Sequence, residues 1–72
     1  MMLTTEQRRA LAVLADTGRD GAAEAIMAAR FGVEVLAGLV RKGWASVDVE
    51  TVVVRMRITE AGRQALAAGS QR

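Results

Sequence analysis

Acid–base and metal chemistry in this chain would have to rely on side chains other than histidine and cysteine. Its 72 residues include no histidine and no cysteine, which removes the usual zinc ligands and the commonest general base. No glycine-rich loop has the strand and helix context that phosphate binding requires. The acidic residues of the N-terminal half are scattered over predicted helix surfaces without a partner base: Asp16, Asp20, Glu24 and Glu34. We therefore expect no enzymatic activity, no catalytic residue, no metal, no cofactor and no small-molecule ligand.

Basic side chains could instead neutralise phosphate groups. Lys and Arg number 10 and Asp and Glu 8, a formal net charge of +2, which is a mild bias rather than the dense charge of a strong nucleic-acid binder. The charge balance is −1 over residues 1–36 and +3 over residues 37–72, so an anionic partner should prefer the C-terminal half. The candidate phosphate contacts are Arg30, Arg41, Lys42, Arg55 and Arg57.

Two helices should position the N-terminal half. Thr4 and Gln7 have the spacing of a capping box, and the helix that they begin should end at Gly18, a plausible left-handed stop. Asp20 is the expected N-cap of a second helix that ends near Arg30.

A third helix should run from about Val33 to Lys42, between Gly32 in the preceding turn and Gly43 at its end. Its exposed face would carry Glu34, Ala37, Gly38 and Arg41. Across the three helices, the residues expected to face the core at helical spacing are Ala10, Leu11, Leu14, Ala15, Ala22, Ala23, Ile26, Met27, Val35, Leu36, Leu39 and Val40.

The pattern then changes to the alternation of strands. Residues 46–50 and 52–58 predict an antiparallel hairpin that turns near residues 50–51. Thr59 should cap a short final helix that ends at Gly69, with residues 70–72 frayed. On the polar face of the hairpin, the acidic and basic pairs expected to lie across from one another are Asp48 and Glu50, and Arg55 and Arg57.

One domain over residues 1–72 accounts for the whole chain, since a second core would have nothing left to bury. Apolar residues make up 51% of the sequence, enough for a packed core. We expect no membrane span and no signal peptide, which makes the cytoplasm the default location. The residues that interrupt the longest apolar stretch are Glu24, Arg30 and Glu34.

Two segments resemble the winged helix-turn-helix family of small bacterial DNA-binding domains. Residues 39–44, Leu-Val-Arg-Lys-Gly-Trp, look like the end of a recognition helix, its glycine stop and the apolar residue that opens the wing. Residues 56–63 are similar to the junction after the wing in many bacterial regulators. The resemblance implies an α+β fold of three helices, a two-stranded β-hairpin wing and a short C-terminal helix, with Trp44 in the core. It also implies a regulator that binds double-stranded DNA, as a homodimer, through the five basic residues named above.

A protein–protein interaction module on the same scaffold is the alternative. Two features support it: helix 33–42 has an apolar exposed face, and the net charge is small. A third is a turn that looks shortened. Leu36 and Leu39 match the apolar positions that the helix-turn-helix family has after the turn glycine only if two residues are missing before them. In this interpretation Arg55 and Arg57 pair with acidic residues of the hairpin, and helix 33–42 packs on a partner or on its own copy. A positive stripe broken by Glu34, Asp48 and Glu50 would favour it.

Overall fold

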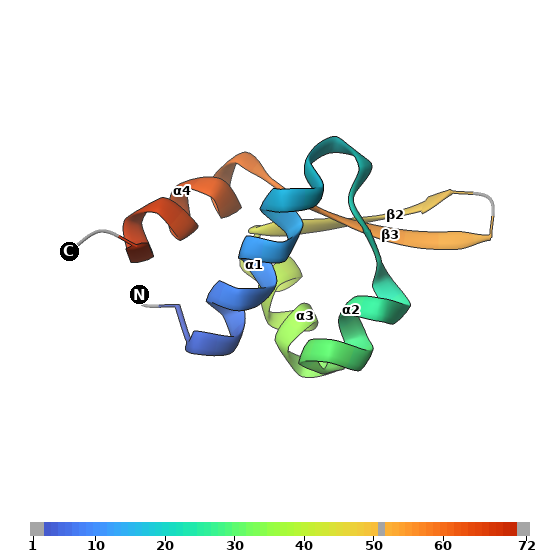
Figure 1. Cartoon of the computed structure of the whole chain (residues 1–72), viewed down its shortest axis with the longest axis horizontal. Coiled ribbons are helices and arrows are strands. Elements are labelled where there is room, and N and C mark those ends of the chain that lie inside the picture. The colour runs from blue at the N-terminus through green and yellow to red at the C-terminus, as the bar shows by residue number, and fades with distance from the viewer. Residues whose placement is uncertain (1–2, 51, 71–72) are drawn as a thin grey trace.

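The computed structural model describes residues 3–50 and 52–70. Over these residues the chain forms four α-helices and a three-stranded antiparallel sheet of order β1-β3-β2 (Figure 1). The elements in chain order are α1 (Thr5–Thr17), η1 (Gly18–Asp20), β1 (Ala22–Ala23), α2 (Glu24–Phe31), α3 (Val33–Arg41), β2 (Ala45–Glu50), β3 (Val53–Ile58) and α4 (Glu60–Ser70). This arrangement is compatible with the expected winged helix, with a third strand, β1, beside the predicted hairpin.

The start of α1 has the predicted capping box. The Thr4 hydroxyl accepts a hydrogen bond from the Gln7 backbone N–H at 3.0 Å, and the Gln7 side chain accepts one from the Thr4 N–H at 3.0 Å. The helix ends at Gly18, as expected, where the Gly18 N–H donates to the Leu14 carbonyl. Because two donors of the first turn are satisfied locally, the start of α1 needs no tertiary partner.

The predicted start of α2 at Asp20 is wrong. Asp20 ends the 3-10 turn η1, and α2 begins at Glu24 without a side-chain cap. Between them β1 pairs with β3, Ala22 opposite Met56 and Ala23 opposite Arg55. The helix starts later than predicted because of a tertiary contact. The backbone groups of Ala22 and Ala23 pair with the side of β3 that β2 leaves unpaired, instead of forming a first helical turn. The predicted two-stranded wing is therefore one part of a three-stranded sheet.

Gly21 allows this pairing. It has a φ of 72°, and an added Cβ would lie 2.5 Å from the Met56 carbonyl oxygen. Only glycine combines that backbone conformation with that closeness to another strand.

The turn between α2 and α3 consists of Gly32 alone. Helix-turn-helix units more often have about 3–4 turn residues, so the shortened turn expected from the sequence is present. Helix α3 ends at Arg41, one residue before the predicted end, and buries Leu36 and Leu39.

The strands β2 and β3 form the expected antiparallel hairpin, in which Arg57 lies opposite Ser46. Asp48 lies opposite Arg55 and Val47 opposite Met56, and the last pair is Glu50 with Val53. The predicted turn near residues 50–51 falls partly on Thr51, which lies outside the described residues, and Val52, predicted to begin the second strand, precedes β3. Because successive side chains alternate between faces, Val47 and Met56 lie on one face of the sheet, and Asp48 and Arg55 on the other.

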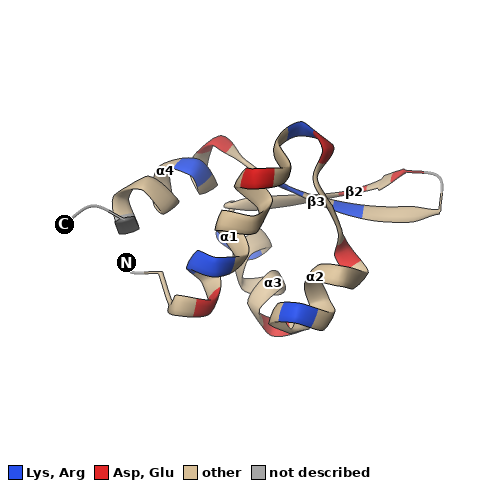
Figure 2. Ribbon diagram, in the orientation of Figure 1, with Lys and Arg blue, Asp and Glu red and all other residues tan. Residues whose placement is uncertain are grey.

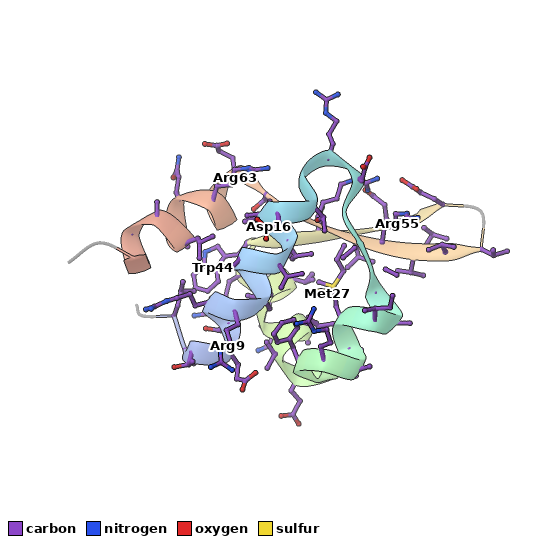
Figure 3. All side chains as sticks on the ribbon, in the orientation of Figure 1. Arg9, Asp16, Met27, Trp44, Arg55 and Arg63 are labelled. Atoms are coloured by element: carbon purple, nitrogen blue, oxygen red, sulfur yellow. The ribbon has the colours of Figure 1, made fainter. Side chains whose placement is uncertain are left out.

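The core lies where α1, α2 and α3 meet the sheet. Met27 is buried, as predicted, and Trp44 is half-buried against the core (Figure 3). Met56 of β3 is buried as well. The prediction that Ile26 and Val40 face the core is wrong, since 61% and 41% of their surfaces are exposed. Ile26 lies about 100° around α2 from Met27, outside the narrow face that this short helix buries. The buried hydrophobic residues are Ala10, Leu11, Leu14, Met27, Leu36, Leu39, Ala45 and Met56.

Helix α4 joins the domain through backbone contacts at its first turn. Thr59 caps it as predicted, because its hydroxyl accepts from the Gly62 N–H at 3.0 Å and donates to the Gly43 carbonyl at 2.6 Å. The Thr59 N–H donates to the Trp44 carbonyl at 3.0 Å. Ser70, expected to fray, is the last residue of α4, and residues 71–72 lie outside the described residues. In the described part of the chain, no helix has the length and apolar character to cross a membrane.

Candidate interaction surface

The five basic residues predicted to contact phosphate lie at the end of α2, at the end of α3 and on β3. Arg30, at the end of α2, has its guanidinium 5.5 Å from the centre of the Phe31 ring. Arg41 and Lys42 are exposed at the end of α3, where the Lys42 ammonium lies 5.6 Å from the Trp44 ring centre. Figure 2 shows acidic and basic segments interspersed along the ribbon.

Arg55 and Arg57 share one face of β3, as predicted, and both pair with acidic residues of β2. The Arg57 guanidinium contacts Asp48 at 2.7 Å and Glu50 at 2.6 Å, and Arg55 lies 3.5 Å from Glu50. These contacts confirm the expected cross-strand charge pairs. They neutralise part of the positive charge that a phosphate clamp on the hairpin would need.

A third contact of Arg57 was not foreseen. Its Nε–H donates to the Arg19 carbonyl at 2.7 Å, so one guanidinium joins β3 to both β2 and η1. The hydrogen bond from Arg57 lowers the pKa of Glu50, and the same pair raises the pKa of Arg57. A carboxylate favours its charged form when it accepts such a bond. The Arg57 side chain thus connects β2, β3 and η1 through hydrogen bonds on the outer face of the sheet. The alternation of the strand residues does not predict this role, because it depends on the position of η1.

An apolar groove lies on the other face, between α3 and the hairpin. It has a volume of about 400 Å³ and two charged residues in its lining. We call it the α3–hairpin groove, and its lining residues are Glu24, Val33, Leu36, Ala37, Val40, Arg41, Val47 and Met56.

The exposed residues of the groove are mostly valines. Val33 is 66% exposed, Val40 41% and Val47 43%. Val49, on the same face of β2, continues the apolar surface toward the hairpin tip and is 72% exposed. Single exposed valines are ordinary in proteins, whereas a contiguous apolar surface marks a binding site.

The alternation of residues 46–50 indicates the part of this surface that belongs to the hairpin. It places Val47 and Val49 together on the apolar face of the strand, which would ordinarily be covered by the core. In the structure the tip of the hairpin projects beyond the helices (Figure 1), and Val47 and Val49 are 43% and 72% exposed. The length of a strand can be estimated from sequence, but how far its helical cover extends is a tertiary property.

No protein-family model matches the chain, and no curated protein or solved structure matches it either. The resemblance to the winged-helix family therefore stays a prediction, and the structure itself establishes a small α+β domain compatible with that arrangement.

Proposed function

We propose that this domain is a protein–protein interaction module whose binding surface is the α3–hairpin groove. The observation that carries the proposal is the row of exposed valines, Val33 and Val40 from α3 and Val47 from β2, that line one groove. Removing such apolar surface from water is the main driving force of protein association. An apolar centre with few charges is also the usual composition of an interface core.

The same face is poorly suited to reading DNA. A recognition helix reads base edges with Arg, Lys, Asn or Gln, and of these the groove contains Arg41 alone, together with the acidic Glu24. Glu34, exposed in the first turn of α3, would repel phosphate. Arg55 and Arg57 lie on the opposite face of the sheet from Met56, which lines the groove.

DNA binding is the second candidate function. The exposed pair Arg41 and Lys42 at the end of α3 favours it, as does an arrangement compatible with a winged helix. With so few phosphate contacts, binding by one domain would fall in the non-specific range, with a Kd of about 10⁻⁴–10⁻⁶ M and a steep dependence on salt.

A photo-crosslinking residue at Val40, in the cells that make this protein, tests the proposal. We expect a covalent adduct with a protein, and its loss when Ala37→Glu is added. The control position is Gln64, which is exposed on α4 away from the groove and should give no such adduct. Absence of any protein adduct from Val40 would overturn the proposal.

Fluorescence anisotropy with random-sequence duplex DNA tests the competing function. We expect no binding at low salt. Binding that weakens steeply with salt and is lost in the double variant Arg41→Ala, Lys42→Ala would replace the interaction module with a DNA-binding domain.

A further inference from the structure

We propose that the occupant of the α3–hairpin groove is a second copy of this chain, packed with α3 antiparallel to α3 of the partner subunit around a two-fold axis near Ala37. This inference rests on the proposed function, because it names the partner of the same groove. Its support is the symmetric order of residue types along α3.

The first part of that symmetry is apolar. Val33 and Val40 lie four residues before and three residues after Ala37, and all three line the groove. Residues at this spacing share one face of a helix. When two such helices cross in opposite directions, Val33 of each chain meets Val40 of the partner subunit. Ala37, exposed at the centre, is small enough for the helix axes to approach to about 8–10 Å.

The second part is charge. Glu34 and Arg41 are exposed, seven residues apart, at opposite ends of α3. They are separated by about 10 Å along the helix axis, and neither has an ion-pair partner within residues 3–50 and 52–70. In an antiparallel pair, Glu34 of each chain lies near Arg41 of the partner subunit, which makes two salt bridges. A parallel pair would put like charges together and is disfavoured.

Gly38 does not contribute to this contact. A Cβ added there would lie 3.4 Å from the Gln7 side chain of α1, so the glycine faces the domain's own first helix. Gly38, predicted on the exposed face of the helix, instead faces α1, and the small residue at the proposed two-fold axis is Ala37.

The hairpin extends the contact beyond α3. Val47 borders the groove, and Val49 follows it on the same face of β2. They would cover the flanks of the incoming helix, which helps the surface approach the roughly 1,000 Å² of total burial that a specific interface needs. Because an isologous contact uses the same patch on both chains, the assembly closes at two copies.

Sedimentation equilibrium of the full chain tests this geometry. The unmodified chain should dimerise reversibly, and Glu34→Arg and Arg41→Glu should each weaken dimerisation at least tenfold. An equimolar mixture of the two variants should restore it, since every Glu34→Arg position then faces an Arg41→Glu position. Thermal melts verify that each variant is folded. A mixture as monomeric as its components, or single variants as dimeric as the unmodified chain, would overturn the proposed pairing.

Ala37→Glu keeps the test independent of the charged pair. A carboxylate at the axis would meet its own copy, so we expect a monomer, whereas the matched control Ala61→Glu, exposed on α4, should remain dimeric. A monomeric unmodified chain that still crosslinks from Val40 to a different protein would overturn the second copy and leave the proposed function standing. Absence of any crosslink from Val40 would remove the proposed function itself.

Discussion

Two helical glycines should respond in opposite directions to the same substitution. Gly62 lies in the first turns of α4, and a Cβ there would overlap the Trp44 carbonyl oxygen and lie 2.8 Å from an Ile58 side-chain carbon. Gly38 lies within α3, and a Cβ there would meet only the end of the Gln7 side chain at 3.4 Å. Gly62→Ala should therefore destabilise the domain, and Gly38→Ala should stabilise it.

The magnitudes follow from the contacts. Overpacking against a backbone atom costs about 1–3 kcal/mol. If α4 moves away, the bond from the Thr59 N–H to the Trp44 carbonyl weakens as well, a further loss of about 1 kcal/mol. Alanine in a helix recovers about 1 kcal/mol relative to glycine, which leaves Gly62→Ala about 1–3 kcal/mol less stable. At Gly38 the helix preference acts almost alone, so Gly38→Ala should gain up to about 1 kcal/mol.

Urea denaturation followed by circular dichroism measures both changes, with thermal melts as a second readout. For a domain of this size, 1 kcal/mol corresponds to about 4–8 °C in Tm, so a difference of about 2–4 kcal/mol between the two variants corresponds to roughly 8 °C or more. If Gly62→Ala were as stable as the unmodified chain, the close docking of α4 on the Trp44 backbone would be refuted. A destabilised Gly38→Ala would mean that α1 and α3 pack more tightly than their contacts indicate.

Three further outcomes are expected. Trp44→Ala should cost about 3 kcal/mol, the lower end for a large aromatic residue because Trp44 is half-buried; an unchanged urea midpoint would contradict its packing on the core. Gly21→Ala should lower Tm, because its φ is 72° and Met56 is close; an unchanged melt would contradict the β1–β3 pairing. At pH 7, Arg57→Gln should lower Tm more than Arg55→Gln. That difference should shrink in acid: the folded pKa of Glu50 is lowered, so its stabilisation is present above the ordinary pKa of about 4.3 and lost as pH falls through the folded value, while the bond from Arg57 to the Arg19 carbonyl remains. A difference as large in acid as at pH 7 would contradict the contribution of the Arg57–Glu50 pair.

The predicted phosphate contacts illustrate the limit of charge patterns. The sequence shows where basic residues occur, and strand alternation correctly placed Arg55 and Arg57 on one face opposite acidic partners. It could not show that the Arg30 guanidinium lies over the Phe31 ring, or that the Arg57 side chain also donates a hydrogen bond to the Arg19 carbonyl. Whether any of the five basic residues contacts DNA stays a prediction, for which the anisotropy experiment is the test.

Local signals determined most of the secondary structure. The Thr4–Gln7 capping box, the Thr59 cap and the alternation of the hairpin act within a few residues, so they can be recognised without knowledge of the fold. The same locality explains the error at Asp20. It has the chemistry of an N-cap, but the hydrogen bonds that the next residues form depend on β3, more than thirty positions away.

The order of the helices and the hairpin, the caps that delimit most of them and the faces of the strands could all be predicted, because they depend on spacing and on neighbouring backbone groups. Three features emerge only in the folded molecule: Ala22 and Ala23 form a strand, Gly62 must lack a side chain, and the valines of α3 and β2 line an uncovered groove. Each of these depends on the distance between segments far apart in the chain, and that distance is set by how the helices and the sheet share one small core.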